Sequence, residues 1–253
     1  MIERGHFAEE FKDRFPAWRC PRCWHGSMKL IKPTLAVEHT AASQAGRGHD
    51  AWDPDWDEHR FVALLHCTQT DCLETVSIAG SRRHDVYQVA WSEHEEEHFF
   101  RPRSIFPAVP LFRVPVECPE QVEANIVKAF ELFWIDLGAC ANRLRIAIER
   151  LLDDRRINKT NGKPGSDRRR LTAHARIEKL GKSHRDAASH LLAIKWIGNE
   201  GAHQGDANRD DILDAFELIE AAVEEIYVRS KADLKRKATA ISRRKGKPRK
   251  AGI

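Results

Sequence analysis

The spacing of apolar residues changes near residue 117 and divides the chain into two parts. From Pro119 onward apolar residues recur at three- and four-residue steps, the spacing of one face of an amphipathic helix. This spacing predicts a helix that starts near Pro119, a second over Leu137–Asp154, and a last one that carries Ile212, Phe216, Ile219, Val223 and Ile226. Residues 117–230 are therefore predicted to form an all-α bundle of four or five helices.

Two shorter helical patterns lie between these. Asp167 is placed to cap a helix that ends at Gly181, and Ser183 with Asp186 forms a capping box for the next helix. The segment between the second helix and Asp167 is rich in Gly, Pro and Asn, which predicts a loop.

The N-terminal part has short apolar and β-branched stretches instead, at residues 28–37, 60–67, 75–79 and 85–91. Stretches of this length suit an antiparallel ribbon. Residues 1–112 are predicted to be a small β-rich module, so the expected fold class is α+β.

Composition excludes several classes of protein. The chain has 253 residues, of which 42% are hydrophobic and 32% charged, too apolar for a wholly disordered protein. No window approaches 18 uninterrupted apolar residues, so we expect no membrane partner. The N-terminus lacks the continuous apolar run of a secretory signal, and we expect a cytoplasmic protein.

The formal net charge of +4 is distributed unevenly. Residues 231–253 contain ten basic residues and one acidic residue, so the tail carries +9 and the preceding 230 residues carry −5. Such a run predicts a disordered basic arm. Contact with RNA or DNA is favoured about as much as the alternative, a solubilising extension or a helix end that frays into solvent. A second basic cluster lies in the loop 155–170, where a solvated connection is the simpler interpretation and phosphate contact the alternative.

Four of the six cysteines fall into two pairs. Cys20 and Cys23 have the two-residue spacing of a zinc knuckle, and Cys67 and Cys72 form a looser pair. Four thiolates would hold structural Zn²⁺ in a closed tetrahedral site. Two alternatives remain open: four unligated buried thiols, or a site in which His66 or His25 replaces one cysteine. Trp18 and Trp24 flank the knuckle and are expected to pack against the ribbon rather than to stack on bases.

Two further patterns involve histidine. Residues 94–98 read His-Glu-Glu-Glu-His, which matches the HExxH zinc motif literally. The preceding residues read as a strand and Pro102 follows closely, so a solvated acidic turn is the better interpretation. The second pattern places Lys195, Asn199 and His203 four residues apart on one helical stripe, next to Gly198 and Gly201.

The order of these features resembles domain-of-unknown-function family 4145 (DUF 4145). The resemblance rests on a CPxC start, a second cysteine pair, Phe106-Pro107, Arg145-x-x-x-Glu149 and the ending IGNEGAH, over nearly the whole chain to about residue 230. That family is similar to the HEPN helical-domain class of bacterial defence systems. Active members of that class are metal-independent ribonucleases, commonly dimeric, with an Arg-Asn-x-x-x-His motif.

Asn199 and His203 match that motif, whereas Gly198 occupies the position of its arginine. A nuclease would therefore need Lys195 or Arg145 to supply the cation. The resemblance implies a zinc-ribbon-like module fused to a HEPN-like bundle. We expect a nucleic-acid or partner-binding module linked to bacterial defence, self-associating as a homodimer. The alternatives are a metal-independent ribonuclease that uses His203, and a purely structural dimerisation scaffold.

Overall fold

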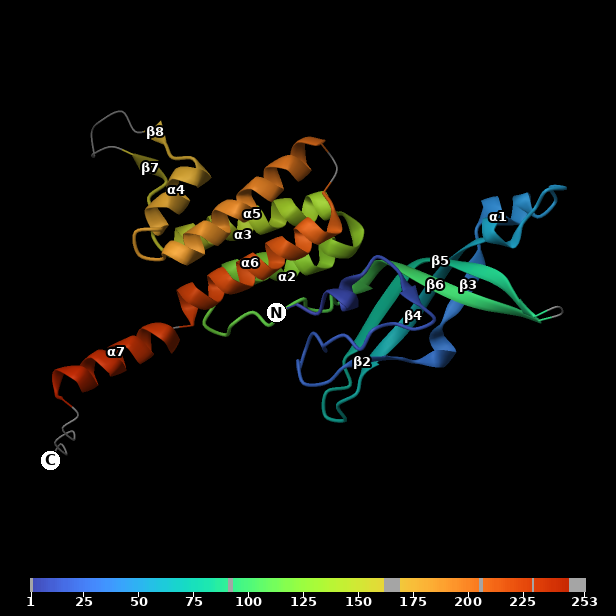
Figure 1. The fold of residues 1–253 in the computed structure, drawn as a ribbon, viewed down its shortest axis with the longest axis horizontal. Coiled ribbons are helices and arrows are strands. Elements are labelled where there is room, and N and C mark those ends of the chain that lie inside the picture. The colour runs from blue at the N-terminus through green and yellow to red at the C-terminus, as the bar shows by residue number, and fades with distance from the viewer. Residues whose placement is uncertain (1, 91–92, 162–168, 205–206, 229, 246–253) are drawn as a thin grey trace.

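The computed structural model describes residues 2–90, 93–161, 169–204, 207–228 and 230–245. Within these ranges, the side chains of residues 55, 87–90, 93–94, 199–204 and 230–235 are left out of the description. Figure 1 shows a sheet with its loops at one side of the molecule, a helical bundle at the other, and a final helix that projects from the bundle. The predicted α+β class is confirmed.

The N-terminal part is built on one antiparallel sheet of six strands. These are β1 (Phe11–Lys12), β2 (Met28–Leu30), β3 (Ala36–His39), β4 (Glu58–Cys67), β5 (Thr75–Ala90) and β6 (Glu93–Phe106). The strand order is β1-β6-β5-β4-β2, and β3 also pairs with β4. Short helical turns η1 (Arg4–Phe7), η2 (Lys32–Thr34) and η3 (Pro54–Trp56) and the helix α1 (Ala41–Gly46) connect or flank the strands.

The apolar core of the sheet lies on one face. Buried and exposed residues alternate along β4, because successive side chains of a strand point to opposite faces. Phe61 on the buried face packs edge-on against Phe100 of β6, with ring centroids 5.2 Å apart. Trp18 is buried against the same core, as expected, and its Nε1 donates to the carbonyl oxygen of His6 at 2.6 Å.

One long strand replaces two predicted short ones. The residues 75–79 and 85–91 were expected as separate strands, but β5 runs continuously from Thr75 to Ala90. Gly80 is the reason for the difference. It lies at a register shift between β5 and β6, where an added β-carbon would be 2.1 Å from the Arg101 carbonyl oxygen. The glycine therefore permits a close backbone approach and does not end the strand.

The helical part contains the predicted bundle. Its helices are α2 (Glu120–Ile135), α3 (Leu137–Asp154), α4 (Ala173–Leu180), α5 (Arg185–Gln204) and α6 (Arg209–Tyr227). Asp136 separates α2 from α3 and caps α3, since its Oδ1 accepts a hydrogen bond from the Ala139 amide at 2.8 Å. The cap of α4 is Thr172, whereas the predicted cap Asp167 lies outside the described residues.

The predicted basic segments are more ordered than expected. Within the loop 155–170, β7 (Thr160–Asn161) pairs with β8 (Arg169–Arg170) as a short antiparallel ribbon. The arm expected to be disordered from residue 231 forms most of the helix α7 (Ser230–Arg243). Its Ala, Leu, Lys and Arg residues are strong helix formers. The prediction of disorder gave more weight to the charge of the segment than to this helix propensity. Residues 246–253 lie outside the described residues.

The sheet and the bundle share a core. Trp134 of α2 packs edge-on against Trp18, with ring centroids 5.7 Å apart, and Phe7 of η1 packs on Phe133 at 6.1 Å. Arg4 of η1 also donates to the carboxylate of Glu217 on α6 at 3.0 Å. Among the described residues, no helix combines the length and the apolar character that crossing a membrane requires.

Candidate metal centre and helical site

The four paired cysteines meet at one end of β4. Cys67 is its last residue, Cys72 lies in the turn before β5, and the other two lie in a turn that the Arg19–Ser27 bridge closes. The sulfur atoms of Cys20 and Cys72 are 3.7 Å apart, and those of Cys23 and Cys67 are 3.6 Å apart. All four sulfurs lie within 4.8 Å of one another, so two distant pieces of chain form one cluster.

Backbone hydrogen bonds hold the two turns together. The Cys20 amide donates to the Gly26 carbonyl at 2.9 Å, and the Thr68 amide donates to the Ser27 carbonyl at 3.0 Å. The residue that follows each cysteine pair has a positive φ, which is 62° at Trp24 and 50° at Leu73. Each turn therefore passes through the left-handed region directly after its second cysteine.

Two amide groups point at the sulfurs. The Gly26 amide donates to Cys23 Sγ at 3.4 Å, and the Gln69 amide donates to Cys67 Sγ at 3.4 Å. An added β-carbon at Gly26 would lie only 2.3 Å from Cys67 Sγ. The second turn therefore occupies the space that any side chain at position 26 would need.

The environment affects the thiols unequally. Burial raises the pKa of Cys20 to about 12 and also raises the pKa of Cys67. The Gly26 amide, which favours the thiolate, lowers the pKa of Cys23 to about 7. The raised pKa values of Cys20 and Cys67 disfavour their thiolates, whereas a coordinated metal favours them, because a coordinating thiol is deprotonated.

The cluster fits a tetrahedral metal ion. Metal–sulfur bonds of about 2.3 Å give sulfur–sulfur edges of about 3.8 Å in a regular tetrahedron, close to the observed 3.6 and 3.7 Å. His66 is exposed on the opposite face of β4, and His25 is exposed in the first turn. Neither belongs to the cluster among the described residues. The structure thus brings together the four predicted cysteines rather than a set containing histidine.

The predicted helical site lies where α3 meets α5. Gly198 is buried against the stem of Arg145, and an added β-carbon there would be 2.6 Å from Arg145 Cδ. Lys195 Nζ lies 3.7 Å from the ring centroid of Trp196. Asn199 and His203 are on α5, but their side chains are outside the description. That Arg145, Lys195, Asn199 and His203 meet in one site remains a prediction.

Comparison with known families finds two matches, and they divide the chain at the same place as the fold does. Residues 127–244 match Domain of unknown function (DUF4145), and residues 9–106 match a second family, Domain of unknown function (DUF8608). The DUF4145 match covers the helical part of the chain from within α2 through α7. The predicted resemblance is thereby confirmed, but it does not extend over the sheet, and it runs beyond residue 230 into α7. No curated protein and no solved structure matches the chain.

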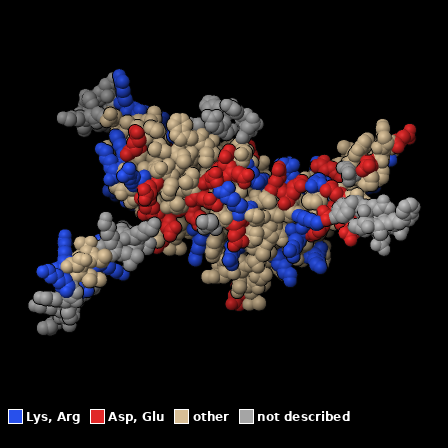
Figure 2. Space-filling model, viewed as in Figure 1, with Lys and Arg blue, Asp and Glu red and all other residues tan. Residues whose placement is uncertain are grey.

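The DUF4145 domain carries both basic segments at one end. Tyr227, the last residue of α6, donates to the carboxylate of Asp154, the last residue of α3, at 3.1 Å. The basic ribbon follows α3 and the basic helix α7 follows α6, so the two segments leave the helical bundle from neighbouring points. Figures 1 and 2 show them at the end remote from the sheet, with lysine and arginine side chains gathered there.

The HExxH match lies outside this domain, on β6. The acidic turn expected there is wrong, because Glu93–Phe106 forms a strand that pairs with β5 along its length. The side chain of His94 is outside the description, whereas His98 Nδ1 lies 2.6 Å from Arg82 Nη2. The segment does not form the helix on which the protease motif depends.

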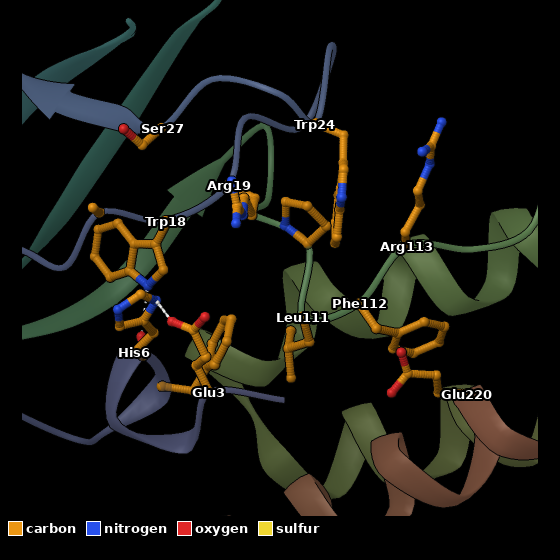
Figure 3. Close-up of a pocket in the computed structure, with 13 residues that line it drawn as sticks. Glu3, His6, Trp18, Arg19, Trp24, Ser27, Leu111, Phe112, Arg113 and Glu220 are labelled. Carbon is orange, nitrogen blue, oxygen red and sulfur yellow. Dashed lines mark hydrogen bonds and ion pairs between the residues drawn. The ribbon is translucent and has the colours of Figure 1, made fainter. Parts of the chain in front are cut away.

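A cleft of about 460 Å³ separates the first cysteine turn from the DUF4145 domain. Figure 3 shows its lining residues coming from four parts of the chain: the N-terminal segment, the turn that carries Trp18, Arg19 and Trp24, the link with Leu111, Phe112 and Arg113, and the helix α6. Glu220 of α6 closes the lower side. Cations and carboxylates both line the cleft, so its charge does not favour one class of ligand.

Sequence patterns missed one group of side chains. His39, Asp57 and His59 each place a ligand atom within 4.8 Å of the others. Their positions, at the end of one strand and the start of the next, give no motif with a fixed spacing. The one sequence signal is that Asp57 and His59 are two residues apart at the start of a strand, so that their side chains are expected on the same face of the sheet.

Proposed function

We propose that this protein binds nucleic acid through the basic end of a HEPN-like bundle, in a role linked to bacterial defence. Its N-terminal zinc-ribbon-like module holds structural Zn²⁺ in the cytoplasm. The observation that carries the binding proposal is the Tyr227–Asp154 contact, which brings the origins of both basic segments together.

The basic end presents cations to solvent. Arg155, Arg156, Lys159, Arg169 and Arg170 are exposed around the ribbon, and the cations of the second half of α7 are largely exposed too. A helix that stands apart from the bundle can follow a phosphate backbone without displacing core contacts. Contacts with about five phosphates would make affinity fall roughly 10²- to 10³-fold between 50 and 200 mM salt.

The binding experiment compares the full chain with a chain that ends at residue 230. We expect the full chain to retain a fluorescent RNA or DNA oligonucleotide at low salt and the shortened chain to bind it at least about tenfold more weakly, with a smaller salt slope. Arg169→Gln with Arg170→Gln should weaken binding in the same direction. Arg60→Gln, an exposed arginine on the sheet, is the matched control and should leave binding unchanged. Equal binding by the full and shortened chains would contradict the proposal.

Zinc is proposed for the cysteine cluster because four thiolates favour Zn²⁺ in a closed site without an open position for chemistry. Its binding would contribute on the order of 10 kcal/mol to folding. We expect about one zinc per chain, and Cys20→Ser should lose it together with part of the sheet signal in circular dichroism. Substoichiometric zinc from cells grown with ample metal would contradict this.

A ribonuclease is the second candidate function. The HEPN class stabilises the phosphate with an arginine that this chain lacks at position 198, and the packing of Arg145 on Gly198 brings an arginine from α3 to that position instead. In this reaction His203 would move the proton of the 2′-hydroxyl or of the leaving oxygen, and Arg145 would stabilise charge on the phosphate. The domain would act as a homodimer, as members of the class commonly do.

The ribonuclease test uses RNA in the presence of EDTA. We expect cleavage by the wild type, none by His203→Ala, and a large loss in Arg145→Gln. Lys195→Gln distinguishes the two candidate cations: normal cleavage by this variant assigns the role to Arg145, and we expect it because Lys195 Nζ lies over Trp196. Absence of cleavage by the wild type removes this candidate. A dimer in light scattering with no affinity for polyanions would favour the scaffold instead.

A further inference from the structure

A histidine-rich cluster lies at the far end of the sheet from the cysteines. His39, the last residue of β3, pairs in register with His59 on β4, and their ring centroids are 4.2 Å apart. Asp57 precedes His59 by two residues and so shares its face of the sheet. His39 Nδ1 lies 3.7 Å from the Asp57 carboxylate. Three groups that commonly bind metals therefore converge from two strands.

Two of the three groups are buried, the His39 side chain is 29% exposed, and the polar atoms of the cluster are incompletely satisfied. Asp57 is 3% exposed and His59 is 7% exposed. The Nδ1 atoms of His39 and His59 are buried and have no hydrogen-bond partner among the described residues, and the same holds for His84, whose ring centroid is 5.5 Å from that of His59. Buried polar atoms normally have partners, and these imidazole nitrogens are therefore available to a ligand.

Arg47 contacts two of the three groups, Asp57 and His39. Its Nε donates to Asp57 Oδ2 at 3.1 Å, and its Nη2 donates to Asp57 as well and to His39 Nε2 at 3.1 Å. The Arg47 side chain remains 47% exposed, so it can turn toward solvent without opening the core. The guanidinium compensates the buried carboxylate but gives neither Nδ1 atom a hydrogen bond.

We propose that His39, Asp57 and His59 form a second metal site, which takes a divalent first-row transition ion in place of the Arg47 guanidinium. Two imidazoles and one carboxylate suit such ions and leave coordination positions open. Ligand atoms about 2.1 Å from a tetrahedral ion are about 3.4 Å apart, so the side chains must close by up to about 1.4 Å from their present spacing of at most 4.8 Å.

The second site is independent of the cysteine site. His59 and Cys67 lie near opposite ends of β4, and eight residues of strand span about 27 Å. An ion at one end therefore makes no contact with an ion at the other. The two sites also differ in ligand chemistry, which allows them to be observed separately.

The test is a titration of the full chain, without a histidine tag and stripped of metal, with Co²⁺ and then Zn²⁺. Cobalt bound by thiolates gives sulfur-to-metal charge-transfer absorption, which nitrogen and oxygen ligands do not give. We expect two equivalents per chain, a tight one with that absorption and a weaker one without it. His39→Gln should weaken the second equivalent at least about tenfold and leave the thiolate absorption unchanged.

Arg47→Gln distinguishes a metal site from a purely structural ion pair. We expect it to tighten the second equivalent, because the competing guanidinium is gone. His174→Gln, on α4, is the matched control and should change neither equivalent. Saturation of the wild type at one equivalent overturns the proposal. A second equivalent that survives both His39→Gln and His59→Gln, in chains that keep the thiolate absorption, overturns it too.

Discussion

Replacing Gly26 by alanine tests the geometry of the cysteine cluster without removing a ligand. The new β-carbon would lie 2.3 Å from Cys67 Sγ and 2.9 Å from the side chain of Gln69. Ordinary contact requires about 3.5 Å, so Cys67 Sγ or the first turn must move by about 1.2 Å. Metal–ligand distances tolerate only about 0.2 Å. Because the backbone of Gly26 is outside the left-handed region, the substitution tests space alone.

Disturbing a group that supports a metal ligand typically lowers metal affinity 10- to 100-fold. We expect Gly26→Ala to lower metal affinity by at least this much. A hundredfold loss equals about 2.8 kcal/mol and should lower the thermal unfolding midpoint of the metal-loaded chain. The assay is metal content after dialysis against a graded chelator, combined with a melting curve. Gly5→Ala is the matched control, because no atom lies within 4 Å of its added β-carbon. One equivalent of metal bound by Gly26→Ala with wild-type affinity would refute the reasoning.

Two further predictions concern thiols and pH. In the metal-loaded chain we expect no cysteine to react with a thiol reagent at pH 7. After chelation we expect Cys23 to react first, because the Gly26 amide lowers its pKa to about 7, whereas burial raises the pKa of Cys20 and Cys118 to about 12 and also raises those of Cys67 and Cys140; labelling followed by mass spectrometry checks this. Burial alone would raise the pKa of Asp153, but hydrogen bonds from Lys159 and Arg176 outweigh it and hold the pKa below its usual value. A lowered carboxyl pKa stabilises the fold above the unfolded value near 3.9, and this contribution is lost as pH falls through the folded value. Asp153→Asn should therefore lower the free energy of unfolding, measured in urea, by about 1–3 kcal/mol at pH 7 and by progressively less below pH 4. An equal loss at pH 7 and below pH 4 would contradict this prediction.

Local patterns predicted the helical part well. The predicted second helix, Leu137–Asp154, has the observed bounds of α3, because its apolar face repeats at the helical period and Asp136 supplies a cap. The first cysteine pair was equally readable, since its spacing is set within one turn. Charge misled the prediction for the tail, where helix propensity over Ser230–Arg243 prevailed.

The sequence by itself determined the change from strand to helix near residue 117, the identity of the four cysteines and the DUF4145 resemblance, because each depends on neighbours within a few positions. Only the tertiary structure decided which distant groups meet. Strand register places His39 against His59, and helix packing places Arg145 against Gly198. Such pairings depend on loop closure and burial over the whole chain, and no local spacing encodes them.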